Sequence, residues 1–344
     1  MKPNRHNVTL RDIAAQTGFS VNTVSRALCG KPEIARKTRE TILAAAQEMG
    51  HIRNMLASSL RSGVSKTIAV ILGDVSNPHF AIMMSEIEHH ARSKGYTSFL
   101  INTDEDEAHE FAAIQTALNQ SVDGIIICPC QKSTRNVEYL QGRGVPFVLI
   151  GRRYASLDVP YVVCNDELGG YQAAQHLIKA GHREILLMGG PNYISSAAER
   201  RAGYLRALSQ AGIPCRQELM AQVPVTANGC AETLEELKAQ NIPFTAIFAF
   251  SDIIAWKCWS FLARAGLRVP QDVSIIGFDY IHSRLELPVQ LTSISSKKRH
   301  MSTAAVDLLL ACMGPAGAKA AKQLVIDTTL IIGQTVCEKP ADNR

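Results

Sequence analysis

The first part of the chain, residues 9–50, places apolar residues at helical spacing in three short stretches. Thr9 with Asp12 three positions later is a helix-start signal, and Gly18 ends the first stretch. Ser20 is suited to cap a second helix, and a third stretch follows. Three short helices with a tight turn between the first two predict a helix-turn-helix.

From about residue 66 the pattern changes to short apolar runs that alternate with amphipathic stretches of helix length. The runs predict strands at 67–72, 98–102, 124–128, 147–150, 161–164, 184–188, 246–250 and 274–278. The amphipathic stretches predict helices at 81–94, 107–119, 168–180, 198–211, 229–239 and 254–265. Val- and Ile-rich strands that alternate with helices indicate an α/β fold of parallel sheets with helices on both faces. Because the strands are too many for one sheet, we expect two doubly wound lobes with a ligand cleft between them.

Composition adds little that is specific. The hydrophobic content of 46% is ordinary, and no run approaches the roughly 20 apolar residues of a membrane span. The polar N-terminal segment has no secretory pattern, so we expect a cytoplasmic protein. Nine scattered cysteines then predict reduced, mostly buried thiols, and Cys128-Pro-Cys130 does not make a metal motif. No dinucleotide fingerprint, P-loop or nucleophile elbow is present, so we expect neither a cofactor nor an enzyme activity.

Charge is distributed unevenly along the chain. Residues 1–63 contain ten Lys and Arg against four Asp and Glu, whereas the whole chain has a net charge of +5. The basic excess therefore lies in the N-terminal segment, and the rest of the chain is nearly neutral. A small basic module on a neutral body is typical of a protein that binds a polyanion through that module.

The second predicted helix offers a surface for contacting DNA bases. Asn22 and Arg26 are four residues apart, so they share the face opposite the apolar positions. Asn bonds bidentately to adenine and Arg to guanine in the major groove, and Val21 is placed to meet a thymine methyl. A second set of residues offers hydroxyls or charge to phosphate oxygens. These are Ser20, Thr23, Ser25, Thr38 and Arg39.

The run from Thr9 to Arg26 resembles the signature of the LacI/GalR family of bacterial transcriptional regulators. The segments 38–40, 50–54 and 56–60 match in order and spacing, and the resemblance extends through essentially the whole chain. It implies a homodimer that binds a pseudo-palindromic operator, with Thr9 among the DNA contacts. It also implies a core like that of periplasmic sugar-binding proteins. Two positions depart from the family pattern: Ala35 stands where a capping Ser is common, and Arg53 where Pro is common.

The resemblance also suggests a role for residues 54–62. This segment resembles a hinge helix that folds on operator DNA and inserts a leucine into the minor groove, a wedge that bends the duplex. By position the leucine is Leu60, with Ala57 and Arg61 beside it and Asn54 at the start of the segment. A nine-residue segment is too short to form a stable helix alone, so a plain linker remains the alternative.

We therefore expect three parts. A helix-turn-helix domain covers residues 1–53, a hinge covers 54–63, and an effector-binding and dimerisation core covers 64–344. Within the core, the N-lobe takes about 64–164 and 296–325. The C-lobe takes about 165–295 and 326–338. The C-terminus has no leucine heptad, which favours a dimer without a separate tetramerisation segment.

The effector site is expected in loops at the carboxyl ends of the strands. These loops carry arginines, a carboxylate, hydroxyls and aromatic rings, a combination suited to binding a polyol. The predicted contacts are Asn77, Phe80, Arg152, Ser196, Arg200, Ser251 and Asp279. For two of them a structural role is an alternative: Asp279 would brace a loop, and Asn77 would cap a helix.

The resemblance leaves the effector open. Gly151, Ser251 and Ser296 replace residues that sugar binders often have at these positions, and Pro224 lies near the expected aromatic lid. Arg153 suggests an anionic ligand such as a sugar phosphate.

The leading hypothesis is a repressor of a carbohydrate-utilisation operon, controlled by a sugar-like effector. The alternatives are an activator or dual regulator of the same architecture, or a regulator that responds to a nucleoside or a phosphorylated ligand. A binding protein or enzyme with an incidental N-terminal segment is a further alternative.

Overall fold

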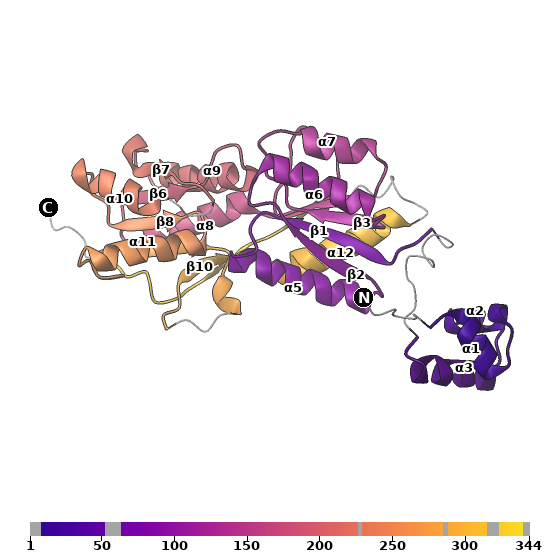
Figure 1. Cartoon of the computed structure of the whole chain (residues 1–344). Coiled ribbons are helices and arrows are strands. Elements are labelled where there is room, and N and C mark those ends of the chain that lie inside the picture. The colour runs from indigo at the N-terminus through magenta and orange to yellow at the C-terminus, as the bar shows by residue number, and fades with distance from the viewer. Residues whose placement is uncertain (1–7, 52–62, 226–228, 285–287, 315–322, 340–344) are drawn as a thin grey trace, which may run out of the picture. The chain divides into compact units, whose positions relative to one another are not determined.

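The structure is a computed structural model that describes residues 8–51, 63–225, 229–284, 288–314 and 323–339 (Figure 1). Contacts divide the chain into two compact units, Met1–Ser65 and Lys66–Arg344. The described residues of the first unit, 8–51 and 63–65, include a bundle of three helices. They are α1 (Leu10–Thr17), α2 (Val21–Leu28) and α3 (Arg36–Glu48). Each contributes a fully buried residue to one small core: Ile13, Val24 and Ile42.

Side-chain caps fix the first two helices as the sequence predicts. Thr9 and Asp12 form a capping box, in which the Thr9 amide donates to the Asp12 carboxylate at 2.7 Å. Ser20 Oγ accepts a hydrogen bond from the Thr23 amide at 3.1 Å. Helix α3 begins after Ala35 and has no side-chain cap, as the departure at this position implies. The helix-turn-helix predicted from the hydrophobic pattern is thus present.

The second unit begins with a six-stranded parallel sheet, which we call the N-lobe together with its helices. Its strands stand in the order β11-β5-β4-β3-β1-β2. They are β1 (Thr67–Leu72), β2 (Thr97–Asn102), β3 (Gly124–Ile127), β4 (Phe147–Ile150), β5 (Tyr161–Cys164) and β11 (Gln323–Ile326). Helices α5 (Pro78–Ser93) and α12 (Lys298–Met313) cover one face. Helices α6 (Glu107–Asn119) and α7 (Arg135–Gly142) cover the other.

A second six-stranded sheet and its helices form the C-lobe. The order is β12-β10-β9-β8-β6-β7, parallel except that β12 runs antiparallel to β10. The strands are β6 (Ile185–Gly189), β7 (Met220–Gln222), β8 (Ala246–Ala249), β9 (Ser274–Phe278), β10 (Thr292–Ser295) and β12 (Thr329–Ile331). Helices α8 (Asp166–Lys179) and α9 (Ser195–Gln210) lie on one face. Helices α10 (Cys230–Ala239) and α11 (Asp252–Arg264) lie on the other. The C-lobe also contains two 3₁₀ turns, η1 (Gln217–Leu219) and η2 (Ile281–Ser283).

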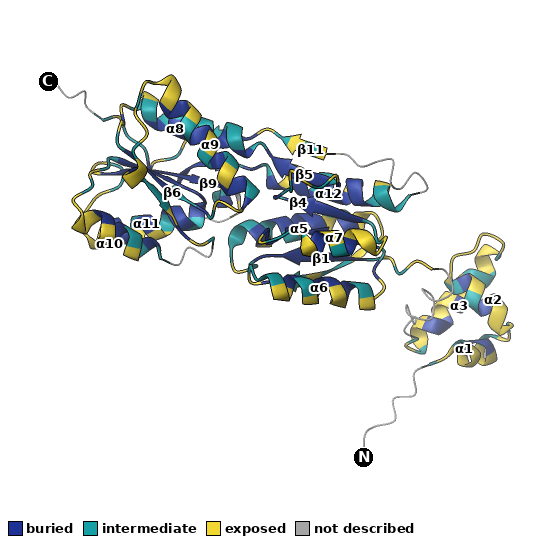
Figure 2. Ribbon diagram, turned by 90° about the horizontal axis from the view of Figure 1, so that it is seen from above, coloured by how far each residue is buried: buried dark blue, intermediate teal, exposed yellow. Residues whose placement is uncertain are grey.

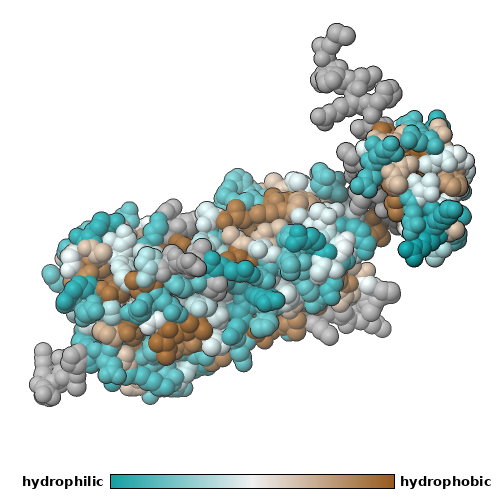
Figure 3. Space-filling model, turned by 90° about the horizontal axis from the view of Figure 1, so that it is seen from below, coloured by the Kyte–Doolittle hydropathy of each residue, from teal (hydrophilic) through white to brown (hydrophobic). Residues whose placement is uncertain are grey.

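The chain passes between the two sheets three times, after β5, after β10 and between β11 and β12. The central strands of each sheet are buried between helices, whereas the edge strand β11 is partly exposed (Figure 2). The prediction of two doubly wound lobes of parallel strands is therefore confirmed. Large apolar side chains that remain exposed, such as Leu100, Tyr193 and Ile332, are scattered. On the face drawn in Figure 3 the brown residues are accordingly interrupted by hydrophilic ones.

Close packing of α8 against α9 sets the geometry on which the C-lobe pocket depends. A Cβ atom on Gly203 would lie 2.0 Å from the Glu167 carbonyl oxygen, and one on Gly170 would lie 2.1 Å from the Arg200 carbonyl oxygen. Both glycines therefore allow the two backbones to approach directly.

We expect Gly203→Ala to force the helices apart and to lower the free energy of unfolding by about 1–3 kcal/mol, the usual cost of overpacking. Urea denaturation would measure the change. Gly142→Ala is the control, because Gly142 is helical and a Cβ atom there would meet no atom within 4 Å. Gly212→Ala would not serve, because the φ of 65° at Gly212 would strain an alanine. A Gly203→Ala variant as stable as Gly142→Ala would contradict the close approach.

Candidate functional site

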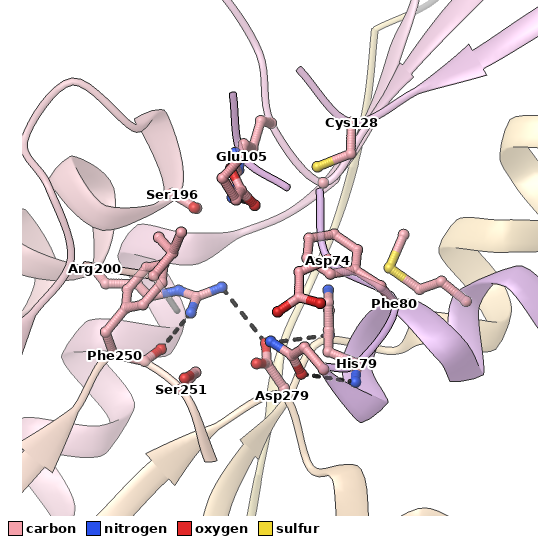
Figure 4. A pocket seen from close by; sticks show the side chains of 15 residues that line it. Asp74, His79, Phe80, Glu105, Cys128, Ser196, Arg200, Phe250, Ser251 and Asp279 are labelled. Carbon is pink, nitrogen blue, oxygen red and sulfur yellow. Dashed lines mark hydrogen bonds and ion pairs between the residues drawn. The ribbon is translucent and has the colours of Figure 1, made fainter. Parts of the chain in front are cut away.

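A pocket of about 570 Å³, part of it open to solvent, lies between the lobes at the carboxyl ends of their strands (Figure 4). All seven residues predicted to contact the effector line it. The N-lobe supplies three, from the start of α5 and from the loop after β4: Asn77, Phe80 and Arg152. The C-lobe supplies four, from α9 and from the loops after β8 and β9: Ser196, Arg200, Ser251 and Asp279. The structure thus brings together side chains that are up to 202 positions apart in the sequence, from Asn77 to Asp279.

Eight further lining residues were not among the predicted contacts. They are Asp74, His79, Met83, Glu105, Cys128, Gly151, Val225 and Phe250. Asp74 and Glu105 could have been found, since each is the second or third residue after a strand that ends at the cleft. His79 and Met83 lie on α5, where the sequence alone gives no sign of which turn faces the cleft.

On the N-lobe side, Arg152 is held by a bidentate ion pair with Glu105. Its two terminal nitrogens lie 2.7 and 2.8 Å from the two carboxylate oxygens, and one of them also donates to the Pro129 carbonyl at 2.9 Å. Gly73 makes room for this pair, because a Cβ there would lie 2.1 Å from a Glu105 carboxylate oxygen. The guanidinium charge is therefore neutralised within the protein before any ligand arrives.

On the C-lobe side, Arg200 is the centre of a buried network. Its Nε donates to Asp166 at 2.7 Å, and its Nη2 lies 3.8 Å from Asp279. The guanidinium also stacks on the Phe278 ring, 3.5 Å from the ring centre, and approaches the Phe250 ring on another side. Arg200 is 7% exposed, and a charge buried to this extent is stable only when paired, here with the carboxylates of Asp166 and Asp279.

Asp279 occupies a strained turn that is fixed from the other lobe. Asp279 and Tyr280 both have left-handed backbone conformations, with φ of 101° and 53°. The buried ammonium of Lys298, at the start of α12, donates to the carbonyl oxygens of both residues. A charged group of the N-lobe thus stabilises the turn that presents Asp279 to the pocket.

His79 lies edge-on against Phe80 and close to Asp279 (Figure 4). Its Nδ1 is 3.4 Å from an Asp279 carboxylate oxygen, without the geometry of a hydrogen bond. Burial, followed by the nearby charges of Lys298, Arg200 and Arg152, holds the pKa of His79 well below its usual value. The imidazole is therefore neutral at pH 7 and can donate or accept a hydrogen bond from a ligand.

Two buried carboxyl groups beside the pocket have raised pKa values. Burial raises the pKa of Asp279 to about 6, although Arg200 and Lys298 oppose the shift. Burial and then the charge of Asp279 raise the pKa of Asp252 to about 7, against hydrogen bonds from Ser293 and the Ile281 amide. The folded protein thus binds protons here that the unfolded chain, with an Asp pKa near 4, releases.

The raised pKa of Asp252 makes the free energy of unfolding depend on pH. The contribution of Asp252 is fully present below pH 4 and is lost as pH rises through about 7, because ionisation in the buried site is unfavourable. We expect Asp252→Asn to reduce the fall in unfolding free energy between pH 5 and pH 8, by at most about 1.4 kcal/mol per pH unit. Urea denaturation across this range measures the slope. Asp272→Asn is the control, because the pKa of this exposed group is lowered to about 2 by Arg268, outside the window. Equal slopes in the two variants would contradict the assignment.

Asn77 and Ser251 also have structural roles. Asn77 caps α5, with its side-chain oxygen accepting from the His79 amide at 3.0 Å, and Ser251 caps α11 through the Ile254 amide. The amide nitrogen of Asn77 remains available at the pocket wall. The alternative noted for Asn77, a helix cap, is therefore present together with its place in the pocket.

Arg153 does not support the anionic ligand that the sequence suggested. Its guanidinium bonds to Glu199 at 2.8 and 3.0 Å and approaches the Tyr161 ring, and it does not line the pocket. The side chain is paired across the lobes because Glu199, on α9, faces the loop after β4. Arg153 therefore contributes to lobe contact rather than to ligand charge.

In the N-terminal unit, Val21, Asn22 and Arg26 form an exposed face of α2, which we call the recognition surface. Val21 is 42% exposed, and the Arg26 side chain is 53% exposed and 4.0 Å from Glu33. Val24 and Ala27 on the opposite side are buried in the core of the bundle. The geometry leaves the recognition surface free to enter a major groove, and its base contacts stay a prediction.

The residues predicted to contact phosphates differ in their surroundings. Ser20 and Thr23 pair with each other at 2.9 Å, and Thr9 is engaged in its capping box. Arg39 donates to the Lys31 carbonyl at 2.6 Å, which ties the loop between α2 and α3. Ser25 and Thr38 are half-buried. These contacts stabilise the domain, and the phosphate roles stay predictions.

The predicted hinge contacts Asn54, Ala57, Leu60 and Arg61 lie outside the described residues. Within the described ranges, no group of three or more His, Cys, Asp or Glu side chains is placed to hold a metal ion. In the same ranges, no helix has both the length and the apolar character needed to cross a membrane. The nine cysteines are all free, and five of them are buried.

Comparison with known proteins agrees with this architecture. The family described as bacterial regulatory proteins, lacI family, matches residues 9–54. The family described as periplasmic binding proteins and sugar binding domain of LacI family matches residues 65–334.

Among curated proteins, the HTH-type transcriptional repressor PurR of Actinobacillus pleuropneumoniae serotype 3 (strain JL03) is 32% identical over 304 residues, which are 88% of this chain and 90% of that protein. Catabolite control protein A of Priestia megaterium is 31% identical over 304 residues, which are 88% of this chain and 92% of that protein.

Solved structures show the same fold. The lac repressor dimer bound to operator and the anti-inducer ONPF superposes with a TM-score of 0.84 at 24% identity, covering 96% of this chain and 99% of that chain. The transcriptional regulator CelR in complex with cellobiose superposes with a TM-score of 0.72 at 25% identity, covering 95% of this chain and 99% of that chain. The resemblance inferred from the sequence is thus confirmed: the chain belongs to the LacI family of bacterial regulatory proteins.

Proposed function

We propose that this protein is a cytoplasmic transcriptional repressor whose affinity for an operator is controlled by a small ligand bound between the lobes. The observation that carries the proposal is the presence, in one chain, of an exposed recognition surface on a helix-turn-helix and a ligand pocket built from both lobes. Curated relatives that cover most of the chain are named as transcriptional repressors, which supports repression over activation. An activator or dual regulator of this architecture is the second candidate.

The charges at the pocket favour a neutral ligand. Five carboxyl groups lie at the pocket or directly behind it, against three cations, and the acids outnumber the cations even though Asp252, with its pKa of about 7, is half protonated at pH 7. The acids are Asp74, Glu105, Asp166, Asp252 and Asp279, and the cations are Arg152, Arg200 and Lys298. Both arginines of the wall already hold carboxylates, so a phosphate would meet no uncompensated positive charge.

Hydroxyl groups match the polar side chains of this pocket. The carboxylates of Asp74 and Asp279 accept hydrogen bonds from ligand hydroxyls, while Asn77 and Ser196 donate or accept. Phe80 and Phe250 offer rings on which the apolar face of a sugar or the plane of a base can lie. A sugar is the first candidate and a neutral nucleoside the second, and the phosphorylated ligand is disfavoured.

Contacts across the cleft suggest how a ligand would be sensed. Lys298 of the N-lobe holds the Asp279 turn of the C-lobe, Arg284 of the C-lobe bonds to Glu86 on α5, and Arg153 bonds to Glu199. A ligand that contacts both walls would shift the lobes and change these pairs. Effector and operator affinities would then be reciprocally coupled. We further propose that the protein acts as a homodimer on a pseudo-palindromic site, with one recognition surface in each half-site.

Selection of DNA from a random pool by the full chain tests the regulatory function. We expect enrichment of a two-fold symmetric sequence, and we expect none with residues 66–344 alone, a unit that has its own sheets and core. Enrichment by the truncated chain, or none by the full chain, would overturn the proposal. A thermal-shift screen of neutral sugars, nucleosides and sugar phosphates then identifies the effector class. Stabilisation by sugar phosphates alone, if it persists after Arg201, which lies outside this pocket, is replaced by Gln, would contradict the charge argument.

A further inference from the structure

The C-lobe has a second cavity, of about 500 Å³ and partly open to solvent, between α9 and the β6–β7 edge of its sheet. Its floor is apolar and includes Phe248 and Leu187, which are otherwise buried in the core. Its rim is polar and carries Arg201 on α9, Asn192 before α9, and Gln222 at the end of β7. None of these polar residues belongs to the effector pocket.

The polar side chains of the rim face the cavity and solvent without protein partners among the described residues. Across the described ranges, the Arg201 side chain has no ion pair and no hydrogen bond to protein, and the solvent-exposed amides of Asn192 and Gln222 likewise have no protein partner. The acidic groups nearby already hold other cations: Glu199 pairs with Arg153, and Glu218 pairs with Arg216. The half-buried guanidinium of Arg201 is therefore an uncompensated positive charge beside three amide-bearing side chains, the third being Gln217.

This chemistry is the opposite of that in the effector pocket. There, Arg152 and Arg200 are both neutralised by carboxylates, whereas Arg201 is not. A guanidinium that presents free donors binds phosphate or carboxylate oxygens bidentately, and neighbouring amide N–H groups complete the shell of an oxyanion. A neutral sugar would leave the charge of Arg201 unpaired.

We propose that this second cavity binds a small oxyanion, a phosphate ester or a carboxylate, as a ligand separate from the effector. Arg201 holds the anionic group, Asn192 and Gln222 donate to it, and the half-buried Met220 side chain contacts the carbon part of the ligand. Arg200 and Phe250 line both cavities, so an anion in one changes the wall of the other. Occupation of the second cavity is therefore coupled to effector binding, and the operator response integrates two chemical signals.

Calorimetric titration of the full chain with inorganic phosphate, and separately with succinate, at constant ionic strength tests the site. We expect binding of at least one of the two, weakened about tenfold or more by Arg201→Gln, which removes the charge. Phosphate alone would identify a phosphate ester as the natural class, and succinate alone a carboxylate.

Arg206→Gln is the matched control, because Arg206 lies on the same helix but is paired with Glu167 outside the cavity. This variant should bind as the wild type does, which also separates the site from phosphate binding by the basic N-terminal domain. Absence of binding in the millimolar range, or equal binding by the Arg201→Gln and wild-type chains, would overturn the proposal. Should Arg201→Gln fail to fold, Gln222→Glu places a carboxylate in the rim and is expected to abolish binding; unchanged binding in that variant overturns it equally.

Discussion

Arg200→Met is expected to abolish the response to effector and to lower the free energy of unfolding of the core by about 3–5 kcal/mol. The stability loss follows because Asp166, 2% exposed, and Asp279, 5% exposed, would lose the cation that neutralises them. Methionine preserves the length and the apolar contact with Phe278, so lost packing contributes little. The loss of response follows because Arg200 is part of the C-lobe wall and fixes the orientation of Asp279.

The two effects are separable by experiment. Urea denaturation measures stability, and operator binding with and without the effector measures the response. The double variant Asp166→Asn with Arg200→Met removes one of the orphaned charges, so it should recover part of the stability but none of the response. Arg206→Met is the control for loss of an exposed arginine on the same helix, where an ion pair contributes at most about 1 kcal/mol. An effector response that survives Arg200→Met would remove Arg200 from the binding site.

The sequence predicted the strands and helices that have a continuous apolar run or a clear amphipathic period. Four strands were predicted with the bounds that the structure gives, and so was the helix Glu107–Asn119. The strands are Thr67–Leu72, Phe147–Ile150, Tyr161–Cys164 and Ser274–Phe278. These strands are buried along most or all of their length, and the helix packs against the same sheet as three of them, so their hydrophobic pattern is set by burial.

The elements that were not predicted have weaker patterns for physical reasons. Strand β10, Thr292–Ser295, is polar in sequence, yet Thr292 and Ser293 are fully buried because Thr335 and Asp252 satisfy their hydroxyls and amides. Strand β11 is a sheet edge with half its residues exposed, and β7 and β12 have three residues each. Helix α12 begins with a charged segment, which hides its amphipathic pattern. It follows a strand of the C-lobe but packs on the N-lobe sheet, a contact that local sequence does not indicate.

For the pocket, residue type and position after a strand were sufficient to find the side chains but not their charge state. Arg152 and Arg200 were predicted as ligand contacts without protein partners being assigned to them, and the structure shows both bound to carboxylates. Their partners Glu105 and Asp166 are 47 and 34 residues away in sequence, and only the strand order brings them together. Lys298 was missed for the same reason, because its partners are the carbonyls of a turn in the other lobe.

Arg26→Ala is expected to weaken operator binding by about 1–3 kcal/mol in each half-site, through loss of discrimination at one base pair. Arg26 is one turn beyond Asn22 on the exposed side of α2, and Glu33 at 4.0 Å is too distant and exposed to hold it. Its guanidinium is thus available for a bidentate contact to guanine. Two half-sites together would cost about 2–6 kcal/mol, because well-separated contacts add.

Fluorescence anisotropy with the selected operator, and with each single base-pair variant of it, distinguishes a base contact from a phosphate contact. A base contact predicts that Arg26→Ala binds the operator and the variants at one position equally, and retains discrimination elsewhere. A phosphate contact predicts uniform weakening on every sequence with a smaller salt dependence. Arg36→Ala is the control, because that exposed arginine on α3 pairs with Glu40 and lies off the recognition surface. If the Arg26→Ala variant still discriminated between base pairs at every position of the operator, Arg26 would not contact a base, and specificity would rest on Asn22 and Val21.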